Sequence, residues 1–367
     1  MRYNNLVRTH NVSLIIVLLF SSLILAQNKE DNFLSKIKFN AFLSAGYEYN
    51  FNTPSDAKNS LRIFDTDHNS FKTDVFQFSF HQDIEESAPF GFRADIVTGS
   101  SIPRAIRSAG MNSGDLDVMQ MYVSYLIPVG SGLRIDFGKF ATFLGYELIE
   151  NWEGYNDNHT RSFSFGYSIP FTHTGIKAGY AFSNCASLSL FIVNGWDNAV
   201  DNNKSKSVGA QLALMPAERL NIYANFMTGP EQDNNDSNYR SIFDFVSVYN
   251  VNDLTFGANV NFGSEEFTSA GNTTAKWSSF AGYLKYRFSG LFSIALRGEL
   301  FRDENGARTG TEQDLSEFTI TPAFTLSDHI ILRGDVRFDS SDKETFVKNS
   351  GYSKNQSTLS CNLIYHF

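Results

Sequence analysis

The last residues of the chain, Ser357–Phe367 (STLSCNLIYHF), are the stretch from which the fold is inferred. Apolar residues occupy every second position from Leu359 to Phe367, and the positions between them are mostly polar. A strand formed here is therefore apolar on one face only. This pattern, ending on an aromatic residue, is typical of the closing strand of a bacterial outer-membrane β-barrel. The edge of a soluble sheet shows the same alternation, so the decision rests on the rest of the chain.

The same period of two recurs upstream, first in residues 37–49 and again in Phe76–Phe80. Short turns such as Pro128–Gly132 alternate along the chain with long polar loops such as Leu144–Pro170. The spacing predicts an all-β, transmembrane, antiparallel up-and-down barrel of about 16 strands, with short periplasmic turns and long extracellular loops. A soluble sandwich or propeller would share the alternation of side chains but not the alternation of loop lengths. The strand at residues 36–49 is expected to pair with the closing strand.

The N-terminus predicts export. Arg2 and Arg8 precede an apolar run from Val12 to Leu25, and Ala26 is followed by polar residues. Residues 1–26 are therefore interpreted as a secretory signal peptide, and residues 27–367 as one barrel domain. Removal of two arginines and no acid takes the net charge from -9 to -11, which argues against nucleic acid as a partner.

The composition is unlike that of a helical membrane protein. Aromatic residues make up 15% of the chain, yet the mean hydropathy is -0.23. Beyond the predicted signal peptide no apolar run reaches the ~18 residues that a spanning helix needs. Of the two cysteines, Cys185 falls in a predicted turn and Cys361 on the apolar face of the closing strand, so no disulfide is expected.

The polar face of the predicted strands would line the lumen, and it carries many basic residues. A barrel of about 16 strands is wide enough to hold water, so these residues are expected to line a pore. A basic wall would favour anionic solutes. Cross-strand pairing with acids such as Glu299, Asp335 and Asp339 is the structural alternative. The expected basic pore-lining residues are Lys38, Arg93, Arg134, Lys177, Lys285, Arg287, Arg297, Arg333 and Arg337.

The longest loop, Leu144–Pro170, is the candidate constriction. If it folds into the lumen, its acids face Arg161 and create a transverse field that orients polar solutes. A loop that packs over the outside of the mouth is the alternative, and its aromatic content suits either. The acids in question are Glu147, Glu150, Glu153 and Asp157.

No pattern of catalytic, metal or cofactor residues is recognisable. Asp65 and Asp67 open a calcium-like sequence, but Ser70 stands where a glycine is needed. His159 and His173 match no compact metal site. The G-x-S-x-G motif of serine hydrolases is absent from the sequence. No enzymatic activity and no cofactor are expected.

Several motifs resemble those of the OmpL-like family of bacterial β-barrel porins, the β-barrel porin-2 family. The resemblance covers most of the chain beyond residue 26 and implies an outer-membrane porin, without indicating a solute. The motifs are FGKFATFLGYE (Phe137–Glu147), the Arg161–Ser162 pair, PFTHTG (Pro170–Gly175) and VNGWD (Val193–Asp197), the last followed by Asn202, Asn203 and Lys204.

These observations predict a channel for passive diffusion of small hydrophilic solutes or ions across the outer membrane. The alternatives are a binding or adhesion protein that the barrel anchors, and an outer-membrane lipase. The expected partners are outer-membrane lipid and lipopolysaccharide, small solutes, and the barrel-assembly machinery acting on Phe367. Both a monomer and a homotrimer are open at this point.

Overall fold

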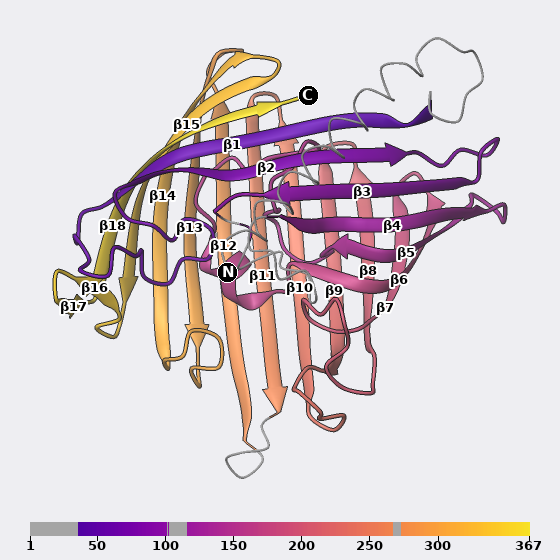
Figure 1. The fold of residues 1–367 in the computed structure, drawn as a ribbon. Coiled ribbons are helices and arrows are strands. Elements are labelled where there is room, and N and C mark those ends of the chain that lie inside the picture. The colour runs from indigo at the N-terminus through magenta and orange to yellow at the C-terminus, as the bar shows by residue number, and fades with distance from the viewer. Residues whose placement is uncertain (1–35, 101, 103–115, 267–272) are drawn as a thin grey trace, which may run out of the picture.

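The computed structural model describes residues 36–100, 102, 116–266 and 273–367, and in it sixteen strands close into one antiparallel barrel (Figure 1). The predicted signal peptide lies outside the described residues. The first half of the barrel consists of β1 (Lys38–Asn50), β2 (Ser70–Gln82), β3 (Phe90–Thr98), β4 (Asp117–Ile127), β5 (Leu133–Ala141), β6 (Thr172–Ser183), β7 (Ala186–Val193) and β8 (Ser207–Ala217). The second half consists of β9 (Leu220–Pro230), β10 (Tyr239–Val251), β11 (Leu254–Glu266), β12 (Thr274–Arg287), β13 (Phe292–Asp303), β14 (Gln313–Ser327), β15 (Ile330–Ser341) and β18 (Asn355–His366).

The barrel closes where β1 pairs with β18, as the sequence predicts. Ala45 lies opposite Leu363 and Tyr49 opposite Leu359. The terminal Phe367 extends the seam, since its N–H donates to the Ala41 carbonyl at 3.1 Å and its carbonyl accepts from the Ala41 N–H at 3.0 Å. The last residue is thus part of the ladder that closes the sheet.

The alternation of the closing strand produces the expected two faces. Leu359, Cys361 and Leu363 are exposed on the outside of the barrel. Thr358 and Asn362, which point inward, are buried. An outward apolar band and an inward polar face are what a lipid-embedded barrel requires.

Cys361 provides a test of this register. In the folded barrel in lipid, a membrane-soluble maleimide should label Cys361 rapidly, whereas a charged thiol reagent should label it at least about tenfold more slowly, because the apolar band is closed to charged molecules. Cys185, exposed in the turn between β6 and β7, is the matched control that both reagents should reach. Mass spectrometry of Cys185→Ser and Cys361→Ser variants separates the two sites. Equal rates of charged labelling at the two cysteines would show that the register is wrong.

Strict alternation is interrupted at several irregularities of the ladder, one of them in β4. Between β3 and β4 the pairing passes from Asp95–Gln120 to Ile96–Val118, which leaves Met119 as the extra residue of a bulge. Met119 is consequently fully buried, although it continues the alternating positions of Met121, Val123 and Tyr125, which are exposed.

The loops follow the predicted rhythm, with short turns at one end of the barrel and long loops at the other. Within the last long loop, β16 (Phe346–Lys348) and β17 (Gly351–Ser353) form a small hairpin of their own. Two long loops turn into the barrel and are called here L1 (residues 51–69) and L3 (residues 142–171). In the part of the chain that the structure describes, no helix is long and apolar enough to cross a membrane.

Candidate functional site

L3 crosses the lumen and reaches strands far from its own ends. It leaves β5 and returns to β6, yet Asn158 Nδ2 donates to Thr321 Oγ1 on β14 at 2.7 Å. His159 Nε2 lies 3.1 Å from Glu48 Oε1 on β1. Ser164 Oγ donates to Asn261 Oδ1 on β11 at 2.5 Å. The loop therefore lies inside the barrel, against the wall opposite its attachment.

Buried arginines of β13 and β15 hold L3 in place. Arg297 Nη1 donates to Glu147 Oε1 at 2.7 Å and to the Thr160 carbonyl at 2.5 Å. Arg333 Nη2 lies 2.7 Å from Glu150 Oε1, and its Nη1 donates to the Asn156 carbonyl. Each guanidinium thus satisfies a loop carboxylate and a loop carbonyl at once, as its several donors allow.

Arg337 completes this row of arginines. Its Nη1 donates to the Arg161 carbonyl of L3, and its Nε lies 2.6 Å from Asp339 Oδ1 on the same strand. The guanidinium also lies over the ring of Phe163, 4.8 Å from its centroid. The side chains of Arg297, Arg333 and Arg337 are at most 1% exposed.

Acids of the wall bind the backbone of L3 in the same way. Glu299 Oε2 accepts from the Phe163 N–H at 2.6 Å, and its Oε1 accepts from the Ser164 N–H. Asp335 accepts from the Thr160 N–H at 2.7 Å. These bonds provide partners for loop amides that would otherwise be buried without one.

The ion pair at Glu150 has a clear electrostatic signature. Burial would raise the pKa of Glu150, but the guanidinium groups of Arg333 and Arg161 outweigh it and lower the pKa to about 2. A carboxyl whose pKa is depressed on folding contributes stability above its ordinary pKa of 4.5, and that contribution is lost as the pH falls towards 2. The anchor at Glu150 therefore stays ionised in moderately acidic medium.

An apolar core inside the lumen supports the same loop. The short π-helical turn η2 (Ser164–Ser168) carries Phe165, whose ring centroid lies 5.8 Å from that of Phe64 in L1 and 5.4 Å from that of Phe171. Leu144 and Ile169 are also buried in this core. L3 is thus held by apolar packing as well as by ion pairs.

L1 adds a second set of buried ions, which the sequence analysis did not identify. Arg62 Nη2 lies 2.5 Å from Asp339 Oδ2, and Arg62 Nη1 pairs with Asp65. Leu61, Ile63 and Phe64 accompany them in an otherwise polar segment. These apolar residues are the signal in the sequence that the loop packs against other parts of the protein.

The remaining charged residues of L3 also meet the wall. Glu153 Oε2 lies 2.6 Å from Arg93 Nη1 on β3, and Asp157 Oδ1 lies 2.7 Å from Lys285 Nζ on β12. Arg161 Nη2 lies 3.5 Å from Glu150 Oε2. The four acids named from the sequence therefore pair chiefly with cations of the barrel wall.

The other basic residues proposed from the sequence lie away from the contacts between L3 and β13 to β15. Lys38 and Arg287 lie near the short-turn end, exposed and paired with Asp83 at 2.6 Å and Asp253 at 2.9 Å. Arg134, on β5, pairs with Asp136 at 2.7 Å. Lys177, on β6, faces a cavity.

This cavity has a volume of about 410 Å³ and lies between L3 and the wall formed by β4 to β10. Its polar lining includes Gln120, Lys177 and Gln211 from the wall, and Tyr146 from L3. A second cavity of about 300 Å³ is lined by Arg93, Trp152 and Glu153, together with residues of the β2–β3 turn. Tyr122 lines both cavities.

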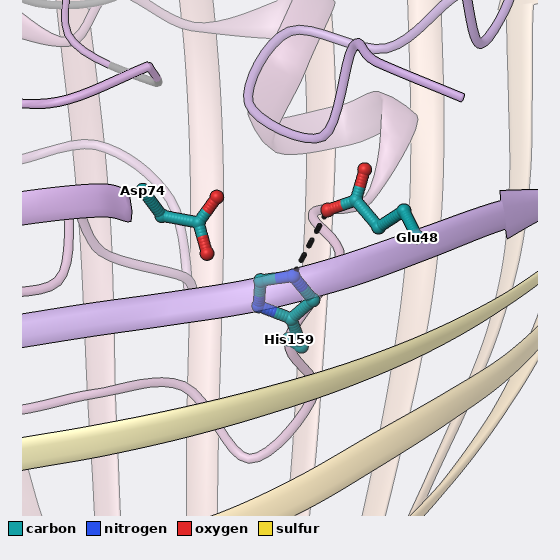
Figure 2. A group of neighbouring side chains, drawn as sticks. All are labelled: Glu48, Asp74 and His159. Carbon is teal, nitrogen blue, oxygen red and sulfur yellow. Dashed lines mark hydrogen bonds and ion pairs between the residues drawn. The ribbon is translucent and has the colours of Figure 1, made fainter. Parts of the chain in front are cut away.

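Glu48, Asp74 and His159 form a buried group with metal-ligand spacing (Figure 2), the ligand atoms all lying within 4.8 Å of one another. The two carboxylates already pair with a cation, because Lys72 Nζ lies 3.0 Å from Glu48 Oε2 and 3.5 Å from Asp74 Oδ1. A divalent ion would have to displace this ammonium. The group is better described as another anchor of L3, in which His159 binds β1.

Most of the motifs that resemble the OmpL-like family lie at the two ends of L3 or contact them. Asp197 Oδ1 accepts from the Phe171 and Thr172 N–H groups at 2.6 and 2.8 Å, so the VNGWD and PFTHTG motifs bind each other. Gly195 has a φ of 137°, and a Cβ there would lie 2.6 Å from Glu231 Oε2. The motif therefore requires glycine at this position and fixes the point where L3 rejoins the barrel.

The second pair of motifs fixes the beginning of the loop. In the FGKFATFLGYE motif, the Gly145 N–H donates to Asp244 Oδ2 on β10 at 2.9 Å. Glu147, the last residue of that motif, accepts from Ser162 N–H and Oγ, both at 2.9 Å. The motifs that carry the resemblance are thus those that position L3.

Comparison with solved structures shows the fold. The Salmonella typhi OmpF complex with daunomycin matches with a TM-score of 0.63 at 13% identity, covering 90% of this chain and 97% of that one. An anion-selective porin from Comamonas acidovorans matches with a TM-score of 0.61 at 9% identity, covering 90% and 99%. The outer-membrane channel DcaP of Acinetobacter baumannii gives 0.59 at 12%, covering 90% and 97%. Among curated proteins, none matches the sequence.

The family assignment comes from the sequence profile described as "Putative beta-barrel porin-2, OmpL-like", which matches residues 36–367. This range includes every barrel strand together with both lumenal loops. The chain belongs to the OmpL-like family of outer-membrane β-barrel porins.

Proposed function

We propose that this porin conducts small hydrophilic solutes passively, along a path between L3 and the wall formed by β4 to β10. The observation that carries the proposal is the one-sided position of L3. Buried ion pairs hold the loop against β13 and β15, while the cavity of about 410 Å³ is left on the other side. The second cavity, which shares Tyr122 with the first, extends the polar lining towards the short turns.

In this arrangement L3 sets the width of the channel. A barrel of sixteen strands would by itself enclose a wide aqueous lumen. L1 and the packed part of L3 fill much of it, and the free space is small. We therefore expect low conductance and a preference for small solutes.

The basic residues named from the sequence have different roles in this proposal. Arg297, Arg333 and Arg337 are neutralised by buried acids and anchor L3, so they contribute little field to the solute path. Arg134 and Lys177 line the remaining space or lie beside it. Lys38, Arg93, Lys285 and Arg287 each pair with an acid.

Planar-bilayer recording of the folded protein tests the proposal. Insertion of single barrels should produce discrete conductance steps, and heat-denatured protein should produce none. A folded protein that inserts, as judged by protease protection in vesicles, and never opens a step would contradict the channel. That result would favour the alternative of a barrel that anchors exterior binding loops.

The proposed partners of the barrel are inferred from its outer surface, its last strand and a similar structure. Outer-membrane lipid and lipopolysaccharide would cover the apolar band, and the barrel-assembly machinery would read the strand that ends at Phe367. A homotrimer is proposed on the precedent of OmpT of Vibrio cholerae, a solved structure of similar fold that is described in a trimer form.

A further inference from the structure

Lys177 differs from the other cations of the lumenal wall. Within the described residues, Arg93, Arg134 and Lys285 each pair with an acid, and the arginines of β13 and β15 do so too. The ammonium of Lys177 forms no hydrogen bond or ion pair with any described residue. It nevertheless faces the cavity between L3 and the wall formed by β4 to β10.

The acids that line this cavity are bound directly by other cations. They are Asp136 and Glu147. Asp136 Oδ1 accepts from Ser124 Oγ at 2.6 Å and from Arg134 Nε at 2.7 Å. Glu147 is bound by Arg297 at 2.7 Å. Asp136 lies opposite Lys177 in the ladder of β5 and β6 and attracts its ammonium, but both acids form their direct contacts with arginines. Lys177 therefore presents an ammonium without a direct partner at the cavity.

The other polar groups of the lining suit an anion with a small organic body. Tyr122, Tyr146 and Tyr223 belong to the lining, and the hydroxyl of a phenol can donate one hydrogen bond. Apolar surface lies beside them, including Phe143 and Leu144 of L3. The volume of about 410 Å³ falls within the usual range for small-molecule sites, so the cavity holds one small molecule at a time.

We propose that Lys177 is the binding point for small organic monocarboxylates within the channel, and that it makes the channel anion-preferring. The inference rests on the proposed function and names its solute class. The carboxylate pairs with the Lys177 ammonium and accepts from a neighbouring phenol, while the organic body lies against the apolar part of the lining. Partial enclosure by L3 strengthens the charge pair relative to bulk water.

The experiment compares benzoate with benzamide, a neutral molecule of nearly the same shape. Benzoate added to wild-type channels in bilayers should interrupt the ion current transiently, and benzamide at equal concentration should not. In a potassium chloride gradient of low ionic strength, Lys177→Gln should lower the chloride-to-potassium permeability ratio about threefold or more, because a positive charge without a direct partner is removed from a narrow path. The same variant should abolish the benzoate interruptions, and Lys177→Arg should retain them.

Lys348→Gln provides the matched control, since it removes one exposed lysine from the exterior hairpin. It should leave both the permeability ratio and the benzoate interruptions unchanged. Channels that open normally but respond equally to benzoate and benzamide would overturn the carboxylate site while leaving the porin function intact. An unchanged permeability ratio in Lys177→Gln would likewise overturn the Lys177 site and leave the porin function intact. Failure of the wild-type protein to conduct at all would instead overturn the proposed function.

Discussion

Replacing Arg297 by methionine is expected to destabilise the folded barrel by about 3–5 kcal/mol, because it leaves two buried carboxylates without their cation. Arg297 is fully buried between Glu147 of L3 and Glu317 of β14, at 2.7 and 2.6 Å. Methionine keeps most of the apolar volume, so the loss is mainly one of charge compensation. The free energy of unfolding in urea, followed by tryptophan fluorescence in lipid vesicles, measures the effect.

Arg302 on the same strand is the control for this variant. It pairs with Asp314 at 2.8 Å, but both side chains are more than half exposed. Since solvent screens an exposed pair, Arg302→Met should leave the unfolding midpoint unchanged. Equal destabilisation by Arg297→Met and Arg302→Met would refute the anchoring role of Arg297.

A double variant locates the interaction more closely. Once Arg297 is methionine, Glu147→Gln should cost less than it does in the wild-type protein, or should restore stability, because the unpaired charge is removed. Strictly additive free energies would mean that Glu147 and Arg297 do not interact, contrary to their buried contact.

Shortening L3 should have the largest effect on conduction. Replacement of Asn151–His159 by a brief Gly–Ser linker removes the contact of His159 with Glu48 and that of Asn158 with Thr321. The space that this segment occupies would then join the aqueous lumen of a sixteen-stranded barrel. Single-channel conductance is expected to rise roughly twofold or more, since a barrel of this size is wide when nothing fills it.

The same replacement at an exterior loop is the control. Asp233–Ser237 lies between β9 and β10 and bonds to the neighbouring exterior loop through Asn202 and Lys204. Replacing it should leave the conductance within experimental error of wild type. If trimming L3 also leaves the conductance unchanged, then L3 does not limit the flow and the proposed path is wrong.

The strands were predictable because a lipid-facing barrel imposes a strict period of two. Every second side chain must be apolar where lipid begins, and the pattern in residues 357–367 reports this directly. The length of each connection separates turns from loops, so strand number and the pairing of β1 with β18 followed as well. The bulge at Met119 was not predictable from the sequence, because an extra residue in a strand changes the face of a side chain without changing the composition of the strand.

The contacts inside the lumen were less predictable, because side chains there pair with residues of strands far away in the sequence. The sequence offered Arg297 and Arg333 as basic residues of the polar face, and gave Glu147 and Glu150 as acids of the longest loop. Nothing in their spacing shows that they meet, since more than a hundred residues separate each pair. The apolar residues of L1 indicate that the loop packs, but the sequence does not show that Arg62 pairs with Asp65 and Asp339.

The sequence by itself determined the barrel: the strands, their faces, their number, and the family motifs at the ends of L3. Only the tertiary structure decided which lumenal charges are available to a solute. It buried the three arginines against acids and left Lys177 facing the cavity. The physical reason is that strand formation depends on a local two-residue period, whereas the electric field of a lumen depends on which distant charges cancel.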